Sequence, residues 1–137
     1  MDRRSFLAAA GATTLGSLAG CVAGQTGARD YDVGMTAQTF EPATITVSVG
    51  EEVVWANTSA RAHSVTAYEA AIPEESEFFA TGGYESEMEA REAWANGKGA
   101  IKTGQDYTHT FEVPGEYRYF CIPHEEAGMI GTVVVEE

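Results

Sequence analysis

Alternation of apolar and polar residues with a period of two is the feature that most constrains the fold. Ile45, Val47 and Val49 alternate with threonine and serine, and residues 130–135 form a final run rich in valine. Successive side chains of a β-strand point to opposite faces of a sheet, so these runs are typical of half-buried strands. Short alternating runs separated by turn residues predict an antiparallel β-sandwich or barrel after residue 31.

The segment around Pro114-Gly115 favours two sheets over one. A tight hairpin turn at this dipeptide would place the apolar Phe111 on the same face as Arg118. The conflict disappears if the chain crosses here from one sheet to the other. We therefore predict a sandwich of two sheets.

The alternation is interrupted between residues 69 and 103. Ser86-Glu87-Met88-Glu89 fits a capping box and Asn96-Gly97 fits a helix stop, which predicts a short helix from Glu87 to Ala95. We interpret residues 69–103 as an insertion on the sandwich rather than a second domain. Three aromatic residues precede the helix: Phe78, Phe79 and Tyr84. They either cover the core or form a docking patch, and the sequence leaves both roles open.

The N-terminal segment has the pattern of a targeting signal. Arg3 and Arg4 precede a weakly apolar run rich in alanine, glycine and threonine, which is typical of a twin-arginine export signal. Leu18-Ala19-Gly20-Cys21 resembles a lipobox, in which the cysteine is lipidated and becomes the mature N-terminus. An uncleaved anchor helix is the alternative.

These patterns divide the chain into three parts. We expect residues 1–20 to be a twin-arginine lipoprotein signal peptide, residues 21–30 a flexible leader anchored by a lipid on Cys21, and residues 31–137 the folded domain. With or without cleavage, the domain is then tethered to the extracytoplasmic face of the cell membrane.

The charge balance excludes one class of partner. With 21 acidic against 8 basic residues, the chain has a formal net charge of −13 and no basic patch, so nucleic acid is not an expected partner. High acidity with only two lysines and twin-arginine export indicates a halophilic archaeon; an ordinary acidic surface is the alternative. At ~1 M salt the Debye length is only ~3 Å, so docking would depend on short-range contact. We expect a monomer.

The two cysteines have different roles in this interpretation. If Cys21 is lipidated, Cys121 is the one thiol left in the mature chain and no intrachain disulfide forms. A lone thiol outside the cell is open to oxidation, and metal ligation would explain its retention.

Cys121 lies in a cluster of potential metal ligands. Cys121, His124 and Met129 follow a strand-like run with the spacing C-x2-H-x4-M, so one loop can present a thiolate, an imidazole and a thioether. Cys121 shares the phase of Tyr119, which predicts that its sulfur points between the sheets. His63 begins another alternating segment and can meet this loop in space.

This set of donors favours copper. Two imidazoles, one thiolate and a weak axial thioether suit the trigonal blue-copper geometry. Zinc would be expected with further cysteine, histidine or carboxylate ligands. A cysteine–histidine nucleophile needs neither the methionine nor the second histidine.

At these residues the chain resembles the plastocyanin-like cupredoxins, which are blue copper proteins. The resemblance covers roughly residues 32–135 and includes AHSVTAYE and YRYFCIPHEEAGM. It implies a cupredoxin-like two-sheet Greek-key β-sandwich with a short helical insertion. It also implies one copper ion that alternates between Cu(I) and Cu(II), with His63, Cys121 and His124 as equatorial ligands and Met129 as the axial ligand.

Residues beside the predicted ligands have supporting roles. Many cupredoxins have asparagine after the first histidine, where it bridges the two ligand loops; Ser64 occupies that place here. Pro123 stiffens the loop between two ligands, and Gly128 permits a turn before Met129. Glu125 and Glu126 are expected at a solvated loop edge; the alternative is that they repel acidic partners from the site of electron exit.

His109 stands apart from the ligand loop. It lies mid-strand in the phase of Tyr107 and Phe111, so we expect a structural, partly buried histidine rather than a fifth ligand.

The predicted function is a membrane-tethered shuttle that carries single electrons between membrane-bound redox proteins. A copper-binding or delivery protein is the alternative. Enzyme interpretations are weak, because a two-copper site needs a second loop cysteine where Glu125 stands and a multicopper oxidase needs more than three histidines.

Overall fold

The computed structural model describes residues 31–137. The predicted signal peptide (1–20), the lipidation site Cys21 and the leader (21–30) lie outside the described residues. Within residues 31–137, no helix is long and apolar enough to cross a bilayer.

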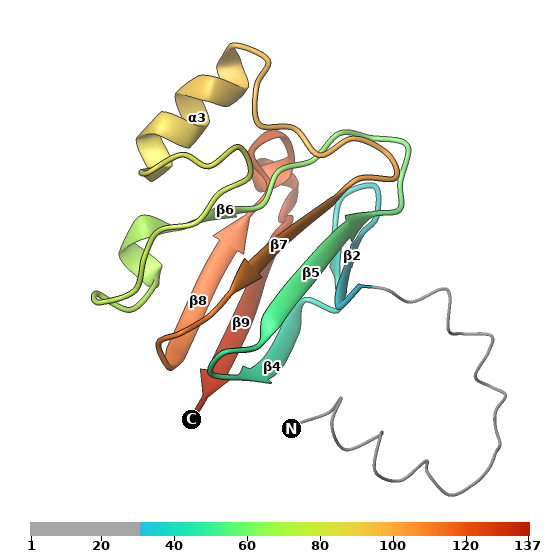
Figure 1. Cartoon of the computed structure of the whole chain (residues 1–137). Coiled ribbons are helices and arrows are strands. Elements are labelled where there is room, and N and C mark those ends of the chain that lie inside the picture. The colour runs from blue at the N-terminus through green and yellow to red at the C-terminus, as the bar shows by residue number, and fades with distance from the viewer. Residues whose placement is uncertain (1–30) are drawn as a thin grey trace, which may run out of the picture.

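Within residues 31–137, eight strands form two four-stranded sheets that pack face to face (Figure 1). The first sheet has the order β3 (Phe40–Glu41), β2 (Val33–Met35), β5 (Glu52–Asn57) and β7 (Asp106–Thr110). The second has the order β4 (Thr44–Ser48), β9 (Ile130–Glu136), β8 (Gly115–Phe120) and β6 (Thr66–Ala67). Since β7 and β8 belong to different sheets, the predicted crossing near Pro114-Gly115 and the two-sheet sandwich are confirmed.

Both sheets are mixed, so the prediction of an antiparallel arrangement was wrong for two strand pairs. β2 pairs with β5 in parallel and β4 pairs with β9 in parallel, whereas the other pairs are antiparallel. Alternation predicts which side chains of a strand face the core. It carries no information about the neighbour with which the strand pairs, because that choice depends on contacts distant in sequence.

The core lies between the sheets and is built largely from aromatic rings. Trp55 is fully buried at its centre, with its ring centroid 5.4 Å from that of Tyr119 and 5.5 Å from that of Tyr107. Further buried apolar members lie in both sheets, and one directly follows β7 (Phe111): Val33, Met35, Phe40, Val47, Val53, Tyr117, Val133 and Val135. This core fixes the framework on which one end of the sandwich is built.

The predicted helix is confirmed as α3 (Glu87–Ala95). The hydroxyl of Ser86 accepts a hydrogen bond from the backbone N–H of Glu89 at 3.1 Å, as an N-cap should. The Glu89 carboxylate accepts from Glu85 rather than from Ser86, so the capping box closes one residue earlier than its standard form. Two short 3₁₀ segments complete the fold, η1 (Glu69–Ala71) and η2 (Ile122–Ala127).

The insertion folds over the outer face of β8 near the edge strand β6 (Figure 1). Phe120 belongs by phase to this outer face, where the alternation predicts an exposed side chain, yet it is fully buried. Tyr68 stacks on its ring at 4.3 Å and the Arg91 guanidinium lies 4.4 Å above it. Phe79, which precedes the helix in the insertion, is part of the hydrophobic core. Of the two roles left open for this residue, packing against the core is therefore the correct one.

We predict that Gly131→Ala lowers the free energy of unfolding by about 1–3 kcal/mol, the usual range for overpacking. Gly131 faces Tyr119 across β8 and β9, and a β-carbon there would overlap the buried Tyr119 ring. Denaturant unfolding of the soluble domain measures the change. Because the Tyr119 hydroxyl is among the overlapped atoms, Tyr119→Phe in the same chain should recover part of the loss. Unchanged stability in Gly131→Ala would contradict the packing described here.

Candidate metal centre

The predicted ligands gather at one end of the sandwich. Cys121 directly follows β8, and η2 carries the chain round to Met129, which directly precedes β9. His63 lies on a separate segment before β6, in an isolated bridge with Ile101: its N–H donates to the Ile101 carbonyl at 3.1 Å, and the Ile101 N–H donates back at 2.7 Å. In Figure 1, η2 and the segment leading into β6 lie at this same end.

Three donor atoms face one another at this end. The Cys121 Sγ lies 3.5 Å from Nδ1 of His63 and 3.4 Å from Nδ1 of His124, and the three atoms all lie within 4.8 Å of one another. His63 and Cys121 are buried, whereas His124 is half-buried. Two segments almost sixty residues apart are therefore brought together as predicted.

Met129 is fully buried at the far end of the loop. Its carbonyl accepts from the Cys121 N–H at 3.1 Å and its own N–H donates to the His124 carbonyl at 3.2 Å. Gly128, directly before it, has a φ of +92°, a left-handed conformation that side chains with a β-carbon rarely adopt. The turn expected at Gly128 is thus present, and it returns the chain to the cysteine.

Ser64 links the two segments that carry the donor atoms. Its N–H donates to the Cys121 Sγ at 3.4 Å, and its hydroxyl accepts from the Ile122 N–H at 2.9 Å. The hydroxyl also lies 3.0 Å from that of Thr66. Ser64 therefore makes a bridge of the kind that the resemblance assigns to asparagine.

Two residues that orient His63 were not found from the sequence. The Ser59 hydroxyl lies 3.0 Å from the His63 Nε2, and it donates to the Asn57 Oδ1 at 2.8 Å. The Asn57 amide in turn donates to the Ile101 carbonyl at 2.8 Å. A hydrogen bond at the outer ring nitrogen orients an imidazole that binds metal through the other. The sequence contained one indication of this role: Asn57 has the inward phase of Trp55, so its amide side chain is expected to be buried.

The pKa shifts of Cys121, His63 and His124 define the protonation state of the metal-free cluster. Burial raises the pKa of Cys121 to about 11, although the hydrogen bond from Ser64 acts in the opposite direction. Burial also lowers the pKa of His63, as does the neighbouring His124, and burial lowers the pKa of His124. At neutral pH the metal-free cluster holds neutral imidazoles and a protonated thiol. A bound cation replaces the thiol proton and stabilises the thiolate.

The remaining residues singled out from the sequence occupy different places. His109 lies in β7, outside the donor cluster, and stacks on Phe79 at 4.6 Å, in agreement with the structural role expected. Pro123 is exposed in the first turn of η2, as expected of a stiffening residue. Glu126 is exposed as predicted.

Glu125 lies on the loop edge as expected, but it is half-buried and paired rather than fully solvated. Its carboxylate accepts hydrogen bonds from the Tyr68 hydroxyl at 2.6 Å and from the Arg91 Nη1 at 2.9 Å. The bond from Arg91 lowers the pKa of Glu125, so its charge is retained at neutral pH. The sequence could not place Arg91 beside this residue, because the path of the insertion depends on tertiary packing.

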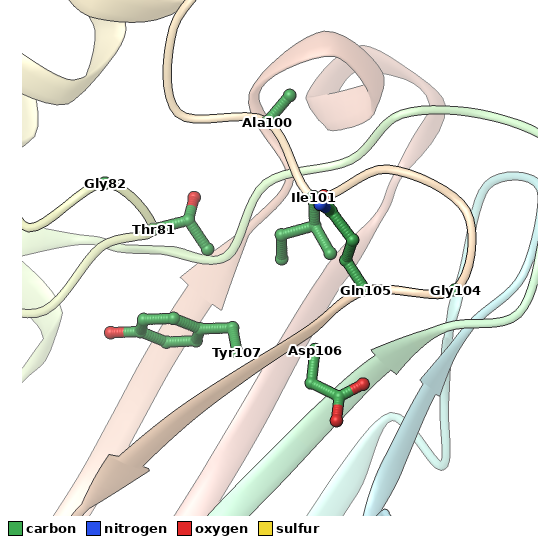
Figure 2. A pocket seen from close by; sticks show the side chains of 8 residues that line it. All are labelled: Thr81, Gly82, Ala100, Ile101, Gly104, Gln105, Asp106 and Tyr107. Carbon is green, nitrogen blue, oxygen red and sulfur yellow. The ribbon is translucent and has the colours of Figure 1, made fainter.

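A separate pocket contains none of the proposed metal ligands (Figure 2). It is lined where the insertion returns to β7, by Thr81, Gly82, Ala100, Ile101, Gly104, Gln105, Asp106 and Tyr107. Asp106 is the one charged side chain in this lining, and the donor cluster is elsewhere. The pocket is therefore not a second candidate for the metal.

Comparison with known proteins identifies the family. Residues 28–136 match the model for copper binding proteins of the plastocyanin/azurin family. The chain therefore belongs to this family of blue copper proteins, the cupredoxins, and copper is its cofactor. The expectation that the protein is not an enzyme agrees with this membership.

Plastocyanins are among the similar sequences. The chain is 35% identical over 100 residues to the chloroplastic plastocyanin of Tetradesmus obliquus, covering 73% of this chain and 60% of the relative. It is 33% identical over 100 residues to the plastocyanin of Scenedesmus fuscus, covering 73% of this chain and 89% of the relative. The match thus spans less than two thirds of the first relative and most of the second.

Similar solved structures confirm the fold. A pseudoazurin from Sinorhizobium has a TM-score of 0.56 at 28% identity, covering 77% of this chain and 72% of that one. An oxidised amicyanin variant has a TM-score of 0.54 at 30% identity, covering 76% of this chain and 79% of that one. The predicted cupredoxin-like sandwich is therefore confirmed.

We predict that Ser64→Ala lowers the free energy of unfolding of the metal-free domain by about 1–2 kcal/mol. The change leaves the Ile122 N–H without the hydroxyl that accepts its hydrogen bond, and an unsatisfied donor is costly. Urea unfolding provides the measurement. Thr66→Val is the matched control: it removes the neighbouring hydroxyl but keeps the Ile122 bond, so it should be less destabilising. Equal losses in the two variants would show that Ser64 does not act as the link.

Proposed function

We propose that this protein is a membrane-tethered, extracytoplasmic electron carrier with one type 1 copper ion. The observation that carries the proposal is the convergence of two imidazole nitrogens and one thiol sulfur within 4.8 Å. The residues fit the ion: His63, Cys121 and His124 would hold it through two imidazoles and a thiolate, and Met129 would add a weak thioether ligand. When bound, copper supplies a change of one electron between Cu(I) and Cu(II).

The protein's own residues keep that centre nearly fixed. Hydrogen bonds to Ser59 and Ser64 hold the His63 imidazole and the Cys121 sulfur in position without metal. A framework that changes little between oxidation states lowers the reorganisation that accompanies electron transfer. His124 is the least buried of the four proposed ligands, so its ring provides the shortest path from the centre to a partner.

The remaining parts of the proposal come from the sequence. The twin-arginine pattern and the lipobox support export and a lipid on Cys21, and the acidic composition supports a haloarchaeal source. Together they favour a halocyanin-like member of the family. Its donor and acceptor would be redox proteins of the same membrane, and the carrier itself would be a monomer.

Copper loading of residues 31–137 tests the metal centre. We predict an intense thiolate-to-Cu(II) absorption band near ~600 nm, as expected of blue-copper ligation. Cys121→Ser should abolish the band while the circular dichroism of the sandwich is kept. Full colour in Cys121→Ser would remove this residue from the site. A colourless wild-type domain that holds copper tightly would favour a copper delivery protein instead.

Expression of the full chain in a haloarchaeal host tests the tether. We predict that the wild-type protein is found in the membrane fraction and is released by detergent, because a lipid on Cys21 anchors it. Cys21→Ser should lose the lipid, as measured by the mass of the mature N-terminus. Unmodified Cys21 in the wild-type protein would contradict the proposed anchor.

A further inference from the structure

One carboxylate connects the insertion with the loop that carries His124. Glu125 directly follows His124, and it accepts from the Tyr68 hydroxyl at 2.6 Å and from the Arg91 guanidinium at 2.9 and 3.3 Å. Tyr68 lies just after β6 and Arg91 lies in α3, so the three side chains join three separate segments. We call Tyr68, Arg91 and Glu125 the clamp.

Arg91 is held in the orientation that the clamp needs. Its Nε and Nη2 donate to the Glu87 carboxylate, one helical turn earlier, at 3.0 and 2.8 Å. Its guanidinium lies over the Phe120 ring at 4.4 Å, a cation–π arrangement. Its side chain is 37% exposed and that of Glu125 is 28% exposed, so the pair is partly shielded from water.

The insertion also contacts the other ligand segment. Its last residues include Ile101, whose backbone exchanges two hydrogen bonds with that of His63. Residues 69–103 therefore contact both segments that carry donor atoms, through Arg91 on one side and Ile101 on the other. The insertion therefore does more than cover the core.

The clamp places charges on the loop that carries a proposed ligand, because Glu125 directly follows His124 and pairs with Arg91. A carboxylate next to His124 favours the more positive oxidation state of a bound ion, and so lowers the reduction potential. A guanidinium paired with that carboxylate offsets the effect. The sign of each contribution is fixed by Coulomb's law, whatever the local dielectric.

We infer that helix α3 supports the metal centre through the clamp, and that Arg91 is a positioning residue that immobilises the loop of His124 and raises the reduction potential of bound copper. The inference rests on the proposed function, because it needs copper at this centre. Residues 69–103 would thereby act on the metal centre in addition to covering the core.

Two variants of the clamp separate charge from structure. In the copper-loaded domain, Arg91→Gln should lower the reduction potential because the Glu125 charge is no longer offset, and Glu125→Gln should raise it. Loosening of the loop alone would shift both variants in the same direction. Shifts of one sign, or no shift in Arg91→Gln, would overturn the electrostatic part.

Amide hydrogen exchange of the metal-free domain tests the clamp without copper. Loss of the partly shielded ion pair, by either substitution, should speed exchange of residues 122–128 by about fivefold, the equivalent of ~1 kcal/mol. Arg91→Lys keeps the charge but loses the fork that binds carboxylate. It should therefore stay near the wild-type potential while exchange still increases. Wild-type exchange in all three variants would overturn the immobilising role.

Lys98→Gln is the matched control. Lys98 is an exposed residue just beyond α3, so the substitution removes one positive charge from the same insertion without changing the clamp. It should leave both the exchange rate and the potential close to wild type. A potential shift as large as that of Arg91→Gln would show that overall charge, not the clamp, is responsible. Failure of the wild-type domain to bind copper would overturn the proposed function, and the exchange data would still decide whether the clamp holds the loop.

Discussion

Pairing of β8 with β9 is the constraint on which the rest of the structure depends. The antiparallel register runs from Gly115 opposite Val135 to Phe120 opposite Ile130, and the bond from the Cys121 N–H to the Met129 carbonyl extends it by one step. The loop between the two sulfur-bearing residues is therefore closed by backbone hydrogen bonds. A slip of one residue would turn Cys121 out of the core, since the side chains of a strand alternate between faces. The position of the Cys121 sulfur in the metal centre therefore depends on the register of β8 against β9.

Local patterns predicted what depends on local chemistry. The inward phase of Cys121, the limits of the helix and the change of sheet before β8 all follow from spacing and turn residues, and the structure contains them. The donor cluster could be predicted because its residue types are rare in this chain. The support of His63 by Ser59 and Asn57 was missed because serine and asparagine are common. Two parallel strand pairs and the contact between Arg91 and Glu125 were out of reach, since they depend on which distant segments become neighbours.

The insertion changes how the acidic composition is understood. Most of its charged residues are glutamates. Glu87 of the insertion and Glu125 of η2 are both paired with Arg91, which also covers Phe120. Such a group combines ion pairing with contact between a ring and a guanidinium. The second component persists when salt screens exposed charges. Packing around a few positively charged side chains can therefore preserve local order in a surface that carries a large excess of negative charge.

The pairing of β2 with β5 determines where the chain enters the sandwich. β2 runs parallel to β5 with Val33 opposite Trp55 and Met35 opposite Asn57, so the chain enters the first sheet partway along β5 and runs toward the end that carries the metal centre (Figure 1). With a lipid at position 21, the ten residues that precede Tyr31 reach at most ~35 Å. Under the proposed lipid anchor, the domain would then stay within about that distance of the bilayer surface. A redox partner whose docking face lies at the membrane surface could therefore be reached without release of the anchor, whereas a freely diffusing partner could be met only at the membrane.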